Sequence, residues 1–171
     1  NPAGMGETTP KSDDYSFMNQ DTVVTIGINP AATAQHYTFS HWTVDGVDDA
    51  SLPLQVKMDE DHTVTAQFVK KLYTLTAVSL PAGAGDLIPK NPTPYQAQST
   101  VTIQAKPVEG SPYVFSRWVV SPEAVPIVDP EQASTDITMI SDVQVTAVFV
   151  KKKVTLALQG DALMGDVYIQ M

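Results

Sequence analysis

The residues of this chain whose chemistry could hold a metal ion are its three histidines and a set of nearby carboxylates. They are His36, His41 and His62, with Asp45, Asp48, Asp49, Asp59, Glu60 and Asp61. Imidazole nitrogens suit zinc, whereas the roughly six to eight oxygens that calcium needs can come from Asp-rich loops. The spacing matches neither a His-x-x-x-His helix nor an EF-hand loop. We therefore expect solvated histidines and acidic turns, and we predict no metal and no cofactor.

Two aromatic triplets could instead stack on the rings of a sugar. They are Tyr37, Phe39 and Trp42, and Tyr113, Phe115 and Trp118. Large aromatic side chains bury about 150–250 Å² each and dominate small cores, so we expect these residues to lie in the interior. Tyr and Phe two positions apart share one strand face, whereas the Trp falls on the other face unless the strand bulges. Solvent exposure of Trp42 and Trp118 would distinguish a sugar-binding platform from a scaffold.

No combination of residues in the chain predicts catalysis. Cysteine is absent, which excludes disulfides, thiolate nucleophiles and thiolate metal ligands. The glycines at 83 and 85 lack the lysine and the following helix of a phosphate-binding loop. Paired carboxylates can be found in any acidic protein and are not specific to a glycosidase. We predict that the protein is not an enzyme, and we assign no catalytic, cofactor-binding or metal-binding residue.

The elements that position these residues are expected to be strands. Charged residues make up 17% of the chain, below the roughly 25% of an average globular protein, and Thr, Val, Ala, Ser and Pro are abundant. Only residues 130–135 could support even one helical turn. The net charge of −9 disfavours nucleic acid and anionic membranes as partners. No apolar run approaches the roughly 20 residues of a membrane-spanning helix.

The 171-residue chain repeats itself at a nearly constant offset. Pro107 lies 77 residues after Pro30, and Phe149 lies 81 residues after Phe68. The extra residues of the second copy fall in the proline-rich stretch at 121–130, which we interpret as a longer surface loop. The fold predicted from this repetition is all-β, with two tandem small antiparallel β modules.

The repeat also accounts for both ends of the chain. The glycine-rich turn at 82–86 matches residues 3–7, but the strand-like run at 72–78 has no counterpart before residue 3. That run begins again at 153–158. We predict repeat module 1 at 1–70, lacking its first strand, repeat module 2 at 71–151, and the start of repeat module 3, a strand or hairpin, at 152–171. Either the parent protein extends in both directions, or the missing edge is completed in another way.

The inward face of the strands changes at each pair of lysines between copies. Apolar residues are even-numbered in 64–68 and odd-numbered in 73–77, and the same change occurs across Lys151 and Lys152. Because side chains alternate between faces with a period of two, this change fits a crossing from one module's core to the next. The alternative is a bulge or tight turn within one sheet.

One ordered series of motifs covers nearly the whole chain: it is complete in the second copy, and most of it recurs in the first. In order, it comprises Tyr-x-Leu-Thr, Gly-Ala-Gly-Asp, Thr-Val-Thr-Ile-x-Ala-x-Pro, Tyr-x-Phe-x-x-Trp and Val-Thr-Ala-x-Phe. This series resembles the divergent internalin-type B-repeat family of bacterial surface proteins. The first copy departs from it at Gly27 and Ile28, where the second has Gln104 and Ala105. The resemblance implies small β-rich modules in tandem on secreted or wall-attached proteins, and it transfers no catalytic residue.

Two functions from different classes follow from these observations. The preferred one is a non-catalytic structural spacer of a bacterial secreted or cell-surface protein, linked to adhesion and located outside the cell. The alternative is a carbohydrate- or protein-binding module whose ligand, an unknown protein or glycan, meets exposed aromatic or acidic loops. We expect a monomer, although the open edge of the first module could pair with a neighbouring chain.

Overall fold

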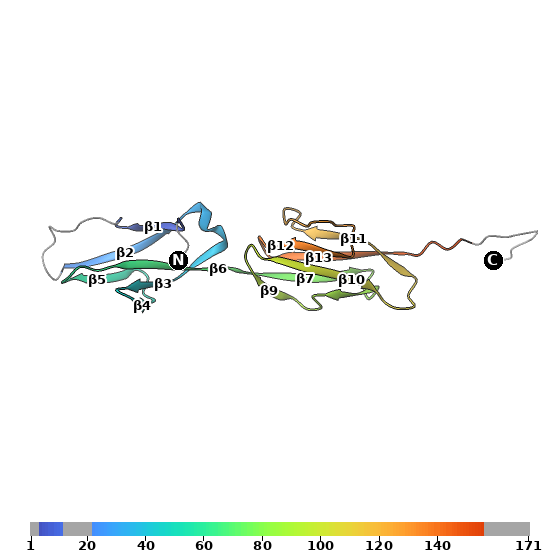
Figure 1. The fold of residues 1–171 in the computed structure, drawn as a ribbon, viewed down its shortest axis with the longest axis horizontal. Helices are drawn as coiled ribbons and strands as arrows, with labels where there is room; N and C mark the ends of the chain where they lie inside the picture. Colours follow the sequence, from blue (N-terminus) through green and yellow to red (C-terminus); the bar gives the residue numbers. More distant parts are fainter. Residues whose placement is uncertain (1–3, 12–21, 156–171) are drawn as a thin grey trace, which may run out of the picture.

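The computed structural model describes residues 4–11 and 22–155, which form two β modules placed end to end (Figure 1). The elements of the first module are β1 (Gly6–Thr9), β2 (Thr22–Pro30), the 3-10 helix η1 (Ala32–His36), β3 (Tyr37–Val44), β4 (Val47–Asp49), β5 (Leu54–Met58) and β6 (Val64–Lys70). Those of the second are β7 (Leu72–Leu80), β8 (Gly85–Ile88), β9 (Thr93–Gln96), β10 (Thr100–Pro107), β11 (Tyr113–Ser121), β12 (Ser134–Thr138) and β13 (Val143–Lys151). The expected start of a third module falls mostly outside the described residues, and residues 152–155 form no regular element.

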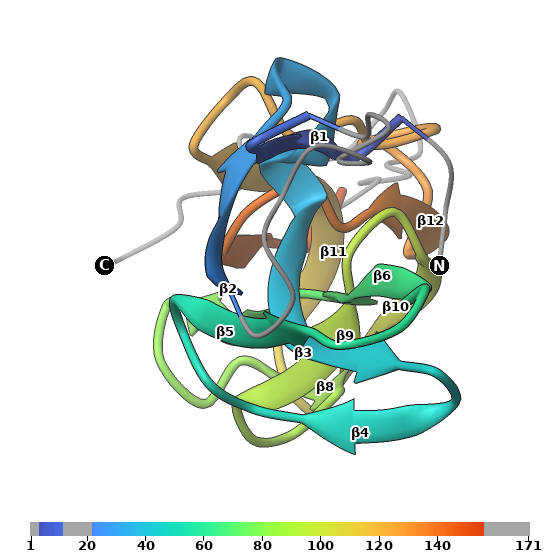
Figure 2. The ribbon, with the colours of Figure 1, turned by 90° about the vertical axis from the view of Figure 1, so that its left-hand side faces the viewer.

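Both modules pair their strands in the same order. The sheet β1-β2-β5 of the first module corresponds to β8-β10-β12 of the second, and the β3-β6 pair corresponds to β11-β13. The prediction that the two halves share one strand order is confirmed for these strands. Strand β4 forms a hairpin with β3 and so adds an outer strand to the second sheet of the first module. Figure 2, which looks along the long axis of the molecule, shows β4 at the lower edge beside β3.

A β-bulge brings the tryptophan of each copy onto the face of the preceding phenylalanine. The register of β3 on β6 shifts between Phe39 and His41, and that of β11 on β13 shifts between Phe115 and Arg117. The extra residue reverses the alternation, so the Phe39 and Trp42 rings meet with centroids 5.1 Å apart. The equivalent rings of the second copy are 5.5 Å apart. The bulge that this motif required is therefore present in both modules.

One strand pairing differs from the antiparallel expectation. Strand β13 pairs in parallel with β7, from Val143 opposite Leu75 to Val148 opposite Leu80. All other strand pairings of the described residues are antiparallel. The first strand of the second module therefore lies beside its last strand, and β9 continues the sheet on the far side of β7.

Each module has its own hydrophobic core. Trp42 and Phe68 are buried in the first module, and Trp118 and Phe149 are buried in the second, as predicted. The second core is the larger, with fourteen buried residues in one cluster, and β7 contributes the fully buried Leu75 to it. The cluster of the first core contains three buried residues, surrounded by partly buried ones.

The joint between the modules consists of a single residue outside the strands. Strand β6 belongs to a sheet of the first module and β7 to a sheet of the second, with Lys71 between them. The face change therefore marks a crossing between cores, and the alternative of a bulge or turn within one sheet is wrong. The backbone N–H of Lys71 donates to the His36 carbonyl at 2.9 Å, and its carbonyl accepts from Ala97 at 2.8 Å.

The short helix of the structure, η1, does not lie at residues 130–135, where the sequence allowed one helical turn. Residues 130–133 form turns and bends before β12, whereas the single 3-10 helix of the described chain is η1. Its last residue, His36, accepts the hydrogen bond from Lys71. The element that the sequence did not indicate thus helps to fix the joint.

Candidate functional site

The most tightly connected polar group of the first module is a histidine held by two carboxylates. Asp45 and Gly46 form the two-residue turn of the β3–β4 hairpin, with φ of 50° and 85°. The Asp45 carboxylate accepts hydrogen bonds from the Thr63 backbone at 2.7 Å and from His62 Nδ1 at 2.6 Å. His62 Nε2 lies 3.4 Å from the Asp59 carboxylate, within ion-pair distance. This arrangement ties the hairpin turn to the start of β6.

The same contacts shift the titration of both groups. The hydrogen bond from His62, with that from the Thr63 backbone, holds the pKa of Asp45 below its ordinary value of 3.8. The hydrogen bond to Asp45, opposed by partial burial, raises the pKa of His62 above 6.5. Each partner therefore favours the charged form of the other, as in a structural ion pair.

We expect the stability of the first module to depend on pH through this pair. The Asp45 contribution is present above pH 3.8 and is lost as pH falls through its lowered pKa. The His62 contribution is present below pH 6.5 and is lost as pH rises through its raised pKa. The pair should stabilise most between these values, and the wild-type melting temperature should fall modestly from pH 6 to pH 8 relative to that of His62→Gln. Equal pH profiles for the two proteins in thermal melts would contradict this assignment.

The histidines do not converge on a common centre. His36 Nδ1 lies 3.2 Å from the Tyr73 hydroxyl, and His41 Nε2 lies 3.3 Å from the Asp48 carboxylate. Asp49 accepts a hydrogen bond from the Ser51 backbone, and contacts with Ser51 lower the pKa of Asp49. Across residues 4–11 and 22–155, no group of three or more histidine, cysteine or acidic side chains could hold a metal ion.

We therefore expect neither EDTA nor added calcium to change the melting temperature appreciably. A ligand that binds only the native state adds about 2.7 kcal/mol at a hundredfold excess over its dissociation constant. Such a gain would raise the melting temperature of a domain of this size by several degrees. A shift of that size in differential scanning fluorimetry would contradict the prediction and would point first to Asp45, Asp48 and Asp49.

The two tryptophans do not form a ligand platform. Trp42 is 0% exposed and Trp118 is 2% exposed, so neither ring can stack on a sugar at the surface. Trp118 Nε1 donates a hydrogen bond to the Gln132 carbonyl at 3.0 Å, whereas Trp42 Nε1 has no hydrogen-bond partner. Gln132 belongs to the long loop of the second module, which explains why only that indole is satisfied.

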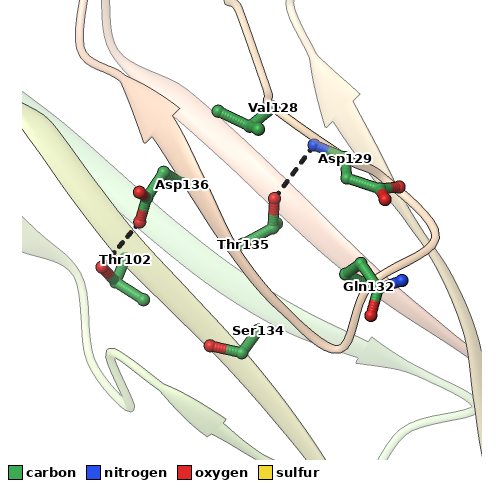
Figure 3. A pocket seen from close by; sticks show the side chains of 7 residues that line it. All are labelled: Thr102, Val128, Asp129, Gln132, Ser134, Thr135 and Asp136. Carbon is green, nitrogen blue, oxygen red and sulfur yellow. Dashed lines mark hydrogen bonds between the residues drawn. The ribbon is translucent and has the colours of Figure 1, made fainter.

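The same loop forms a polar hollow of about 340 Å³ on the second module (Figure 3). Its lining residues are Thr102, Val128, Asp129, Gln132, Ser134, Thr135 and Asp136. Two of the hydroxyls are already engaged, because Thr102 donates to Asp136 at 2.6 Å and Thr135 accepts from the Asp129 backbone at 3.0 Å. The hollow has no aromatic wall, and Val128 is the apolar side chain beside its polar lining. The proline-rich insertion was the sequence signal for this loop, but it did not indicate which side chains would line it.

The comparison with known families agrees with the repeated strand order. The profile of the divergent InlB B-repeat domain matches the chain twice, at residues 1–72 and 73–153. The chain belongs to this family. No curated protein and no solved structure matches it. The family and the all-β tandem fold expected from the motifs are thus confirmed.

The two B-repeats meet at a joint that includes η1, the helix that the sequence did not indicate. Lys71 Nζ donates to the Gln35 carbonyl at 2.7 Å, and the His36 and Tyr73 rings meet edge to face, 6.0 Å apart. The second B-repeat ends with the same backbone contact, from Lys152 N to the Pro112 carbonyl at 2.7 Å. The lysine pairs and the face change located this joint, whereas its partners in η1 lacked a recognisable pattern.

No helix in the described part of the chain has the length and apolar character needed to cross a membrane.

Proposed function

We propose that this tandem of B-repeats is a non-catalytic spacer in a bacterial secreted or cell-surface protein, located outside the cell and linked to adhesion. The observation that carries the proposal is the joint, in which Lys71 alone separates β6 from β7 and bonds to both B-repeats. A connection this short has none of the reach of a flexible coil. Membership of a family typical of bacterial surface proteins supports the extracellular location.

The arrangement of the two B-repeats suits a spacer in length as well as in stiffness. They follow one another along the long axis of the molecule (Figure 1). Every additional module joined in this way adds its full length to the distance between the ends. A stiff tandem therefore holds a distal domain away from its anchor, which is the task of a stalk.

We expect the protein in solution to be an extended rod with limited bending. Small-angle scattering from the monomer should give an elongated distance distribution that calculated curves of the end-to-end arrangement reproduce. Inserting Gly-Ser-Gly-Ser after Lys71 should broaden the distribution, because the joint would then contain a flexible coil. The matched control places the same insertion after Glu123, in the exposed loop of the second B-repeat. A compact, nearly spherical envelope for the unmodified chain would overturn the proposal.

The alternative, a carbohydrate-binding module, loses its aromatic platform because both tryptophans are buried. The polar hollow at the long loop is the place where such binding could still occur. Glycan-array binding that Gln132→Ala and Asp136→Ala abolish would favour this alternative over the spacer.

A further inference from the structure

The outer face of the four-stranded sheet of the second B-repeat is rich in exposed apolar side chains. The sheet has the order β11-β13-β7-β9, and its inner face contributes Trp118 and the buried side chains of β13 to the core. On the opposite face, which we term the apolar face, strand pairing aligns side chains in rows across β11, β13 and β7. Five large apolar side chains there are 36% to 58% exposed: Val78, Leu80, Val114, Val119 and Val150. A cluster of this kind is typical of an interaction surface.

The equivalent face of the first B-repeat is largely polar. Three apolar residues of β11 and β13 on this face have polar counterparts in β3 and β6. The counterparts are Thr38 for Val114, Thr43 for Val119 and Gln67 for Val148. Gln67 Nε2 donates to the Thr43 hydroxyl at 3.2 Å, and that hydroxyl lies 3.4 Å from the Asp48 carboxylate. The same strand arrangement therefore forms with a polar outer face, so folding of the module does not require the apolar one.

The sheet that carries the apolar face has only basic charged residues. Its four strands contain no aspartate or glutamate, although the chain has a net charge of −9. Arg117, the one arginine of the chain, is exposed on the apolar face opposite Val148. Lys151 ends β13. A surface that is both apolar and acidic would complement this face in charge as well as in polarity.

The first B-repeat has a surface of that character. It consists of residues 45–53, which we term the acidic arm and which comprise the β3–β4 turn, β4 and the connection to β5. The acidic arm contains three aspartates and no basic residue. It also carries two large apolar side chains that are mostly exposed, Val47 at 70% and Leu52 at 60%. The arm therefore matches the apolar face in both properties.

Contacts with the rest of the first B-repeat hold the acidic arm in place. The Asp45 carboxylate accepts hydrogen bonds from His62 and from the Thr63 backbone, and β4 pairs with β3 along its whole length. Within the arm, the backbone N–H of Ser51 donates to the Asp49 carboxylate at 2.7 Å. An arm that is already ordered loses little conformational entropy when it binds a partner.

The acidic arm cannot reach the apolar face of its own molecule. Strand β3 begins with Tyr37 opposite Lys70, beside the joint. It ends with Val44 opposite Val64, so the arm starts at the end of the first B-repeat that lies away from the joint. Strand β7 begins at the joint and ends at Leu80, so the apolar face extends to the other end of the molecule (Figure 1). The arm and the face are thus separated along the rod, and a partner for either must come from another molecule.

We propose that two copies of the chain pair side by side and antiparallel, with the acidic arm of each on the apolar face of the other. In this arrangement the outer end of each first B-repeat lies beside the outer end of the other copy's second B-repeat, so both contacts form together. Val47 and Leu52 then pack on the exposed valines, and the aspartates face Arg117. Reciprocal contacts about a twofold axis close the assembly as a dimer. The net charge of the chain disfavours an anionic membrane as the occupant of the face.

Sedimentation velocity with light scattering tests the pairing on the full chain. Between about 1 μM and 1 mM, the mass should rise from that of the monomer to twice that value, and high salt should weaken the rise. The triple variant Val114→Thr/Val119→Thr/Val148→Gln should raise the dissociation constant at least about tenfold, because it copies the polar face of the first B-repeat. The matched control replaces two exposed valines outside the arm and the face, Val23→Thr and Val108→Thr. Thermal melts confirm that both variants are folded.

Charge exchange tests the electrostatic part of the contact. Arg117→Asp and Asp48→Arg should each weaken the dimer, because each places like charges on the two surfaces that meet. The double variant should recover much of the lost affinity, since the charges are then exchanged on both surfaces.

Cross-linking identifies the surfaces that meet, because the chain has no cysteine of its own. A mixture of Val47→Cys and Val119→Cys chains should give disulfide-linked dimers of the two variants on mild oxidation. A mixture of Val23→Cys and Val119→Cys chains is the control and should give few.

A chain that stays monomeric across the whole concentration range would overturn the pairing. Dimers that form equally well with the triple variant, or cross-links that form equally well from Val23→Cys, would also overturn it. The pairing rests on the end-to-end arrangement of the proposed spacer, but the two are tested separately. The scattering curve of the monomer tests the spacer, and the rise in mass tests the dimer.

Discussion

Replacing Phe149 with alanine should lower the free energy of unfolding of the second B-repeat by about 3–5 kcal/mol. The Phe149 ring is 3% exposed and lies edge to face against Phe115, with centroids 5.9 Å apart. Removing it leaves a cavity that the two facing sheets cannot close, because Trp118 and its neighbours are already packed. Such a loss is much of the total stability of a small domain.

Thermal melts followed by circular dichroism measure this effect. Each kcal/mol lost lowers the melting midpoint of a 60–100-residue domain by roughly 4–8 °C. The melting temperature of the second B-repeat should therefore fall steeply. Val150→Ala is the matched control, since that neighbouring side chain is 47% exposed. Phe68→Ala should show the equivalent loss in the first B-repeat. An unchanged melt for Phe149→Ala would mean that the ring does not hold the core together.

Replacing Gly85 with alanine should destabilise the second B-repeat by about 1–3 kcal/mol through overpacking. Gly85 begins β8 opposite Pro107, and a Cβ there would lie 2.8 Å from the Lys106 carbonyl oxygen and overlap the Phe149 ring. Backbone cannot yield as a flexible side chain can, so the strand itself would have to move. The first B-repeat has Gly6 in the equivalent place, opposite Pro30, with the same crowding against Asn29.

The control for this substitution is Gly27→Ala in β2, where the nearest atom to an added Cβ is the Thr9 carbonyl oxygen at 3.9 Å. Combining Gly85→Ala with Phe149→Ala gives a second check. Because the new methyl group would occupy space that the ring vacates, the two losses should not add. Equal stabilities for Gly85→Ala and Gly27→Ala, or strict additivity in the double variant, would contradict the packing argument.

The features of the fold that follow from alternation and repetition were predictable from the sequence. Equal spacing of matched blocks predicted equal strand order, and the change of face at Lys71 located the crossing between cores. The Tyr-x-Phe-x-x-Trp spacing places Phe and Trp on one strand face only if the strand contains a bulge. The structure has these bulges at Ser40 and Ser116. These features depend on local sequence, because the period of a strand decides which face each side chain occupies.

Features that depend on which strands become neighbours were not predictable. The alternation of apolar and polar residues shows which side chains of β7 and β13 point inward, but it does not show that these two strands are neighbours. Their parallel pairing is seen only in the structure. The segment 32–36 has no apolar periodicity that would predict η1. Pairings such as His62 with Asp45 depend on a register between distant segments. The hydrogen bond from the Thr74 backbone to the Asp142 carboxylate is another contact between segments far apart in the sequence.

The parallel pairing of β7 with β13 determines how the second B-repeat would bear a mechanical load. Its first strand enters from one end of the rod and its last strand leaves at the other, so tension pulls the two neighbours in opposite directions along their length. The backbone hydrogen bonds between Leu75 and Leu80 of β7 and Val143 and Val148 of β13 then lie across the direction of pull. They are loaded in shear together, whereas strands peeled apart at one end lose their bonds one at a time. The hydrogen bonds between β7 and β13 therefore resist the separation of the two ends of the module under tension.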